Sequence, residues 1–306
     1  MPNPSSGTSL RENLIGIGAM VTCNLVFLVN DTLLKLANAN LPLGEIIFFR
    51  GLFASILMSA IVFGLGQHRQ FGMLVSFPVF WRTVAEIGGA FFYLFALFHI
   101  PIANANAILQ GVPLMITAAG AVFLGERVGW KRWTASAVGF LGVLVIVRPG
   151  LAGFDGYSVW ALGAMLFITL RDVATRIIKR GVHVLLIAWI TAVAVCLSGV
   201  VFGVSEAWTV PDWRSLGLLA AAAVLAITGY LTAVQAMRHG DISVVAPFRY
   251  TVVIFAIVVG FIVWSEVPDA LMLAGTAIIT ATGIYTLYRE RKIANLAAEA
   301  MAGEGM

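Results

Sequence analysis

The chain has 306 residues, of which 60% are hydrophobic and only 11% are charged. Its mean hydropathy is +0.96, and soluble domains usually carry about 25% charged residues. This composition excludes a globular cytoplasmic enzyme, and it excludes intrinsic disorder, which requires low hydropathy. The net charge of +4 does not indicate nucleic-acid binding, because apolar runs separate the basic residues and no basic patch forms.

Ten apolar runs of membrane-spanning length follow one another along the chain. A helix needs about 20 apolar residues to cross a bilayer, and the loops between the runs are short. An open sheet leaves backbone groups unsatisfied in lipid, and barrel strands would alternate polar and apolar residues, so the runs are predicted to be helices. The predicted spans are 12–37, 44–65, 79–98, 102–123, 129–148, 157–178, 182–205, 214–238, 242–263 and 267–289.

The distribution of Lys and Arg between the loops predicts the orientation, because cytoplasmic loops carry an excess of these residues. With the N-terminus inside, eleven basic residues fall in inside segments and only two, Arg148 and Arg214, in outside segments. We therefore predict a multi-pass protein of the plasma membrane, the inner membrane of a bacterium, with both termini cytoplasmic. Residues 290–306 are predicted to be a cytoplasmic tail.

The chain repeats itself with an offset of about half its length. A shift of 140 residues gives six identities in 31 ungapped positions, including Glu126 on Glu266. The chain therefore divides into two units of five spans, 12–148 and 157–289. Because five is odd, the second unit enters the membrane from the opposite face, and this arrangement is an inverted repeat of the kind found in secondary transporters.

Each unit ends with a glutamate followed by an apolar span that contains glycine. In the first unit, residues 123–150 read FLGERVGWKRWTASAVGFLGVLVIVRPG, with Glu126 at the end of the fourth span. In the second unit, residues 264–287 read WSEVPDALMLAGTAIITATGIYTL, with Glu266 in the matching place but no basic pair after it. These segments resemble the ends of EamA domains in the drug/metabolite transporter superfamily, and the resemblance covers nearly the whole chain. It implies a ten-helix carrier with a central cavity that exports small metabolites, most similar to the amino-acid exporters of the superfamily.

Charged residues inside the spans are costly in lipid, so they are expected to face the bundle interior or a cavity. Three acid–base pairs have their members one helical turn apart, on one helix face. The members are predicted to pair, either to pin helix packing or to line the path and change partners during transport. The pairs are Asp31 with Lys35, Arg82 with Glu86, and Asp172 with Arg176, and a shift of 141 residues places the third on the first.

Prolines lie in two equivalent spans, Pro113 in the fourth and Pro247 in the ninth. Each removes a backbone donor and disfavours a straight helix. We predict kinks or unwound turns there, next to the central site, with freed carbonyls that face a cavity rather than lipid. These prolines and the three acid–base pairs are the predicted gating or helix-pairing residues.

Polar and aromatic side chains in the spans are candidates for lining a substrate cavity, and hydrogen bonding between helices is the alternative. Arg50 and Arg249 stand apart from acids in their own helices, and a buried guanidinium suits a carboxylate. Arg249 is the predicted carboxylate contact, with an interhelical salt bridge or a position at the interface as alternatives. The candidate substrate-binding residues are Asn24, Tyr93, Asn106, Gln110, Trp160, Tyr230, Arg249 and Tyr250.

The sequence therefore predicts a secondary transporter that exports amino acids or similar zwitterions by alternating access. The spans contain no cluster of several basic residues, which disfavours phosphorylated substrates. Because each deep acid has a base one turn away, the acids are expected to stay ionised and transport to be facilitative. The alternatives are a proton-coupled exporter of drugs or other metabolites and an intramembrane enzyme, although no HExxH or G-x-S-x-G motif occurs. No cofactor, metal or nucleic acid is expected, and the protein is expected to act as a monomer in the bilayer.

Overall fold

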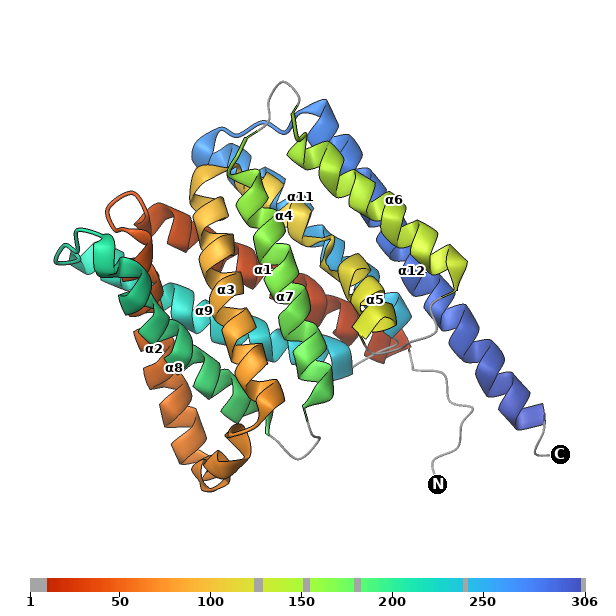
Figure 1. Ribbon diagram of the computed structural model, residues 1–306, viewed down its shortest axis with the longest axis horizontal. Helices are drawn as coiled ribbons and strands as arrows, with labels where there is room; N and C mark the ends of the chain where they lie inside the picture. The colour runs from red at the N-terminus through yellow and green to blue at the C-terminus, as the bar shows by residue number, and fades with distance from the viewer. Residues whose placement is uncertain (1–9, 124–128, 151–154, 179–182, 239–241, 304–306) are drawn as a thin grey trace.

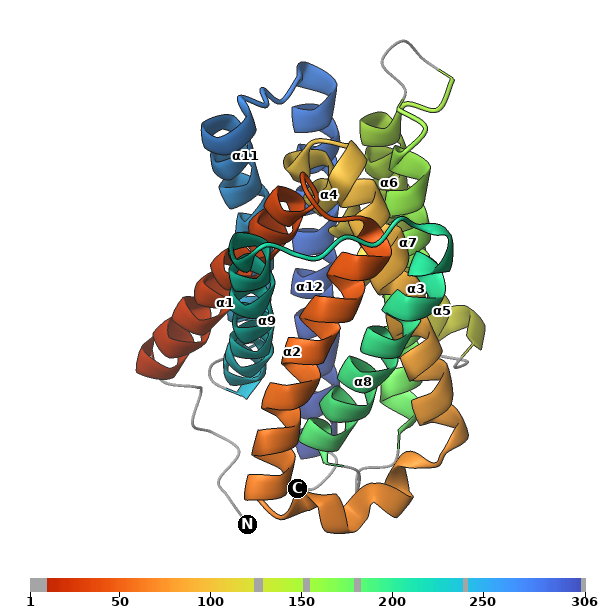
Figure 2. The same cartoon turned by 90° about the vertical axis from the view of Figure 1, so that its left-hand side faces the viewer.

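The computed structural model describes residues 10–123, 129–150, 155–178, 183–238 and 242–303, and the regular elements in these ranges are all helices (Figures 1 and 2). They are α1 (Leu10–Ala37), α2 (Leu43–Gly64), η1 (Gln67–Leu74), α3 (Phe77–His99), α4 (Ile102–Leu109), α5 (Val112–Phe123), α6 (Trp130–Val147), α7 (Ser158–Ile177), α8 (Val184–Phe202), η2 (Gly203–Ser205), α9 (Trp213–Arg238), α10 (Ile242–Val245), η3 (Ala246–Tyr250), α11 (Thr251–Trp264) and α12 (Ala270–Gly303). Within the described ranges, nine helical segments are long and apolar enough to span a membrane, and the shorter apolar helix Trp133–Val147 within α6 supplies a tenth. The predicted all-α membrane fold is confirmed.

The fourth and ninth spans are interrupted near the two prolines, as predicted. α4 ends at Leu109 and α5 begins at Val112, and the amide of Gly111 between them bonds to a carbonyl only three residues back. In the ninth span, Pro247 lies in η3, a turn of 3₁₀-helix between α10 and α11. Tighter turns of this kind form where proline cannot donate to the regular α-helical pattern.

The tenth span extends further than its apolar run. α12 continues to Gly303, so most of the predicted tail 290–306 is helical.

The helix pairing follows the two-fold relation between the two units. With the spans numbered one to ten, extensive contacts join span 1 to span 8 (α1 and α9) and span 3 to span 6 (α3 and α7), and the repeat exchanges these two pairs. Spans 2 and 7 (α2 and α8) and spans 5 and 10 (α6 and α12) pair with their own equivalents. In Figure 1, α2 and α8 form one edge of the bundle and α6 and α12 the opposite edge, with α3, α4 and α7 between them. This pattern is that of two inverted five-helix repeats.

Close packing of α2 on α8 sets the face that α2 turns to the interior. A Cβ on Gly51 would lie 2.6 Å from the Cα of Cys196, so the two helices meet where α2 has no side chain. Ile46 and Ile47 are completely buried. Arg50 follows them by one helical turn and therefore shares their interior face.

Candidate functional site

A first polar group, called the Asp31 layer, consists of Asn30, Asp31, Tyr93, Asn106 and Gln110, from α1, α3 and α4. The Tyr93 hydroxyl donates to one carboxylate oxygen of Asp31, and the Asn30 amide donates to the other at 3.0 Å. Asn106 Nδ2 lies 3.3 Å from the Tyr93 hydroxyl, and Gln110 Nε2 donates to the Asn106 carbonyl at 3.5 Å. The layer joins three helices around a buried carboxyl group that contacts neutral donors.

The predicted ion pair between Asp31 and Lys35 is wrong. Asp31 turns to Tyr93 in the interior, whereas Lys35 Nζ lies 3.0 Å from Glu266 Oε1, on a residue 231 positions away. The two side chains share a helix face, but the long lysine stem reaches the end of the bundle. There its charge meets a carboxylate with less desolvation than in the interior.

The contact between Lys35 and Glu266 holds three segments together at one end of the bundle. Lys35 Nζ also donates to the Ile100 carbonyl at 2.7 Å and lies 4.9 Å from the centre of the Trp264 ring. Glu266 Oε2 accepts the backbone amide of Ile102 at 3.0 Å and thus holds the first turn of α4. The two charged side chains are only 11% and 19% exposed. The end of α1, the start of α4 and the end of α11 are therefore fixed to one another.

Further contacts between the two units lie at the same end, which carries the links 38–42, 100–101 and 265–269 (Figure 2). Arg148 forms an ion pair with Asp269, and its hydrogen bond holds the pKa of that carboxyl below the usual value. Glu206 accepts the backbone amide of Gly44 at 2.8 Å. Glu126, the equivalent of Glu266 in the first unit, lies outside the described residues. At this end, polar contacts join the two units.

A second polar group, called the Glu86 layer, consists of Arg82, Glu86, Arg171, Asp172 and Tyr230, from α3, α7 and α9. Glu86 lies 3.6 Å from Arg82 and 3.5 Å from Arg171, and the Tyr230 hydroxyl donates to it at 3.3 Å. Arg171 Nε donates to Asp172 at 2.8 Å. The layer therefore contains two carboxylates and two guanidinium groups in direct contact.

The predicted pairs on α3 and α7 have different outcomes. The pair between Arg82 and Glu86 is present, although Glu86 is shared with Arg171. Asp172 pairs with Arg171, the residue before it on α7. Arg171 can contact both carboxylates because it lies between Glu86 of the neighbouring helix and Asp172 of its own.

Arg50 lies between the two layers. It interacts electrostatically with Asp31 and Tyr93 of one layer and with Glu86 and Tyr230 of the other. Tyr93 and Glu86 are seven residues apart on α3, which places the layers about 10 Å apart along the helix. In the described part of the chain no hydrogen bond or ion pair uses the Arg50 guanidinium, and its Nε is buried. The sequence signal was an arginine with no acid one turn away, but Arg249 shares that signal and was the predicted contact.

Asn24, Arg249 and Tyr250 lie around the interrupted ninth span and contribute to helix packing. Asn24 Nδ2 donates to the carbonyls of Phe248 at 2.9 Å and Arg249 at 3.1 Å. These carbonyls lie in η3 just after Pro247, so an amide of α1 ties the interrupted segment to α1. Tyr250 is buried, with its hydroxyl packed against α12.

Trp160 packs in an aromatic cluster between α3 and α7. Its ring centre lies 6.1 Å from that of Phe91, 5.1 Å from that of Phe92 and 4.5 Å from that of Phe95. Aromatic contacts of this kind stabilise helix packing.

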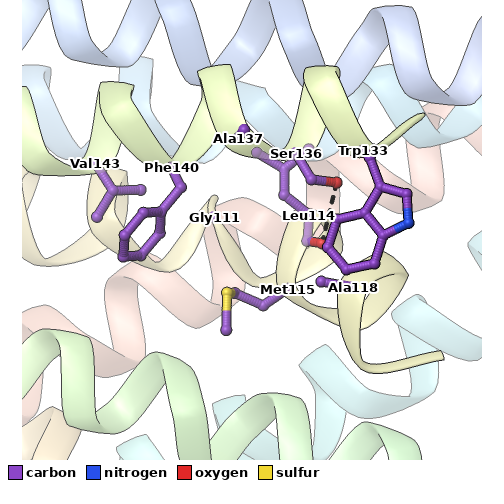
Figure 3. A pocket seen from close by; sticks show the side chains of 9 residues that line it. All are labelled: Gly111, Leu114, Met115, Ala118, Trp133, Ser136, Ala137, Phe140 and Val143. Atoms are coloured by element: carbon purple, nitrogen blue, oxygen red, sulfur yellow. Dashed lines mark hydrogen bonds between the residues drawn. The ribbon is translucent and has the colours of Figure 1, made fainter. Parts of the chain in front are cut away.

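A cavity of about 190 Å³ lies between α5 and α6, and the residues that line it belong to neither polar layer (Figure 3). Apolar side chains line most of it, among them Met115, Trp133 and Phe140. Its polar side chain is Ser136, whose hydroxyl donates to the Leu114 carbonyl at 3.4 Å. Such a lining has no charged group with which to bind a polar metabolite.

Comparisons with known proteins agree with this architecture. Residues 14–148 and 156–289 each match the EamA-like transporter family. The pseudopaline exporter CntI of Pseudomonas aeruginosa is 31% identical over 90% of this chain and 97% of its own length. The S-adenosylmethionine uptake transporter of Rickettsia felis is 26% identical over 93% and 96% of the two chains. The riboflavin transporter of Vibrio cholerae is 26% identical over 69% and 71%.

A solved crystal structure of a protein has the same fold, with a TM-score of 0.62 and 17% sequence identity. The match covers 90% of this chain and 96% of that chain. The family match covers both repeats, and the similarity to the pseudopaline exporter spans nearly the whole of both chains. The chain therefore belongs to the EamA-like transporter family, and it is a multi-pass membrane transporter of small molecules, not an enzyme.

Proposed function

We propose that this transporter exports small zwitterionic metabolites of the amino-acid type. The observation that carries the proposal is the charge balance of the two polar layers together with Arg50. The acids are Asp31, Glu86 and Asp172, and the bases are Arg50, Arg82 and Arg171. A substrate with separated but equal charges preserves this balance, whereas a substrate with net charge would be buried without a full counter-charge.

The relatives support a small organic substrate and leave its identity open. One is named as an exporter of pseudopaline, one as an uptake system for S-adenosylmethionine and one as a riboflavin transporter. The proposed export direction follows the first of these. The bias of basic residues in the loops supports a bacterial inner-membrane location with both termini cytoplasmic. A single chain contains both repeats, which supports a monomeric carrier.

Alternating access requires parts of the bundle to move, and the two interrupted spans are the proposed hinges. The chain around Pro113 and Pro247 leaves the regular α-helical pattern. Such segments absorb rotation at a lower cost than a continuous helix.

We propose facilitative transport, driven by the concentration gradient of the substrate. Glu86 and Asp172 form ion pairs with arginines, so a proton on either carboxylate would leave a guanidinium in the bundle without its counter-charge. Asp31 differs, because among the described residues its carboxyl accepts hydrogen bonds from the neutral donors Tyr93 and Asn30 and forms no ion pair. This observation favours a proton-coupled cycle as the second candidate.

Efflux from proteoliposomes tests both the substrate class and the coupling. Vesicles would be loaded with a mixture of amino acids and phosphoserine, and efflux of each compound would be followed by mass spectrometry. We expect neutral amino acids to leave and phosphoserine to remain. Export of phosphoserine without any amino acid would overturn the proposal. Amino-acid accumulation driven by a pH gradient and lost in Asp31→Asn would select the proton-coupled candidate.

A further inference from the structure

We infer that Arg50 binds the carboxylate of the substrate. The inference rests on the proposed zwitterionic substrate and assigns its two ends to residues. Arg50 is directed to the interior of the bundle by the packing of α2 on α8, and it interacts electrostatically with groups in both polar layers. A planar guanidinium can donate two parallel hydrogen bonds to a carboxylate.

The other arginines of the core already have partners. Arg82 is 3.6 Å from Glu86 and donates through Nε to Thr175 at 3.1 Å. Arg171 contacts Glu86 and Asp172. Among the described residues, the Arg50 guanidinium forms neither a hydrogen bond nor an ion pair, so a ligand can bind it without breaking an existing contact.

Arg249 is a weaker candidate because of its position. Its backbone carbonyl is held by Asn24 on the packing side of η3. Its charge interacts with Cys23 and Tyr250, whereas Arg50 is among the charges that act on Asp31 and Glu86. A carboxylate at Arg249 would place the substrate away from the carboxylates that could bind its ammonium group.

The ammonium end of the substrate belongs beside Asp31. When a carboxylate neutralises Arg50, Asp31 loses a nearby positive charge. Glu86 keeps two arginines in contact, whereas Asp31 has only hydrogen bonds from neutral side chains. An ammonium group bound there restores the charge balance of the core.

The test measures binding of amino acids and of their amides, which lack the carboxylate. The probes are alanine, leucine, methionine and phenylalanine and the four corresponding amides. Each would be titrated against the full-length protein in detergent micelles, with thermal unfolding as the readout. The quantity compared is the ratio of half-saturating concentrations, amide over acid, for each side chain. This ratio is internal to one preparation and does not depend on expression.

We expect the wild type to prefer the acid, and Arg50→Gln to lower this preference by about 10- to 100-fold, as for loss of hydrogen bonds to a charged group. Amide binding should persist in this variant, because the carboxylates remain. The matched control, Arg249→Gln, removes the same group from another span and should keep the wild-type ratio. Should Arg50→Gln not fold, Arg50→Lys keeps the charge without the planar fork, and its preference should fall below that of the wild type.

Three results would overturn the inference while leaving the proposed function intact. They are an unchanged ratio in Arg50→Gln or, where that variant does not fold, in Arg50→Lys; a collapsed ratio in Arg249→Gln; and equal loss of acid and amide binding in Arg50→Gln, which would indicate a structural role. A wild type that binds none of the amino acids would overturn the proposed function and this inference with it.

Discussion

Replacing Glu266 by glutamine isolates the charge of the contact that closes one end of the bundle. Glutamine keeps an oxygen that can accept the Ile102 amide, but it leaves the Lys35 ammonium without a counter-ion. Removing one partner costs about 3–5 kcal/mol in a fully buried ion pair and about 0–1 kcal/mol in an exposed one. With side chains 11% and 19% exposed, we expect Glu266→Gln to lower the free energy of unfolding by about 2–3 kcal/mol.

The backbone contacts of the same residues give a sharper test. Lys35 donates to the Ile100 carbonyl, and Glu266 accepts the Ile102 amide. Exchanging the two charges, as Lys35→Glu with Glu266→Lys, would place a carboxylate against a carbonyl and an ammonium against an amide. The exchanged pair should therefore remain at least as unstable as Glu266→Gln, although its formal charges are complementary.

The assay is reversible unfolding by SDS in mixed micelles, with wild type, Glu266→Gln and the charge exchange measured together. A loss below about 0.5 kcal/mol in Glu266→Gln would show that solvent screens the pair. Recovery of wild-type stability in the charge exchange would show that the backbone contacts contribute nothing. Either result would refute the reasoning.

Gly51→Leu should lower the free energy of unfolding by about 3 kcal/mol, the upper end of overpacking costs, because its Cβ would lie 2.6 Å from an α8 backbone atom. Gly18→Leu, whose Cβ has open space, should be nearly neutral in the same SDS titration. Asn24→Ala should cost about 0.5–1.5 kcal/mol, because it removes the hydrogen bonds from α1 to the Phe248 and Arg249 carbonyls, and it should keep the wild-type amide-to-acid ratio; a changed ratio would place Asn24 in the substrate site. Arg148 lowers the pKa of Asp269, so this ion pair stabilises the fold above the unfolded carboxyl pKa and the stability is lost as pH falls through the lowered value. The melting temperature of Arg148→Gln should therefore lie below that of the wild type at pH 7, and the difference should shrink below about pH 4; a difference independent of pH would contradict the role of the charge.

The sequence by itself determined the membrane fold of this chain and its symmetry. Span length and hydropathy are local properties, because lipid requires each helix to satisfy its own backbone. Likewise, the breaks near Pro113 and Pro247 follow from a missing donor within one segment. The pair of Arg82 and Glu86 could also be predicted from the sequence, since both residues lie on one helix, one turn apart.

Only the tertiary structure decided which partner each buried charge takes. Helical spacing places Asp31 and Lys35 on one face, but Tyr93 of α3 and Glu266 beyond α11 offer each a better partner. Arg50 likewise became distinct from Arg249 only when three other helices, α1, α3 and α9, placed acids and tyrosines around it. Removing a charge from water is costly, so a buried charge pairs with the group whose distance and orientation in the folded protein best compensate for this cost. These distances and orientations are set by the packing of helices that are remote in the sequence.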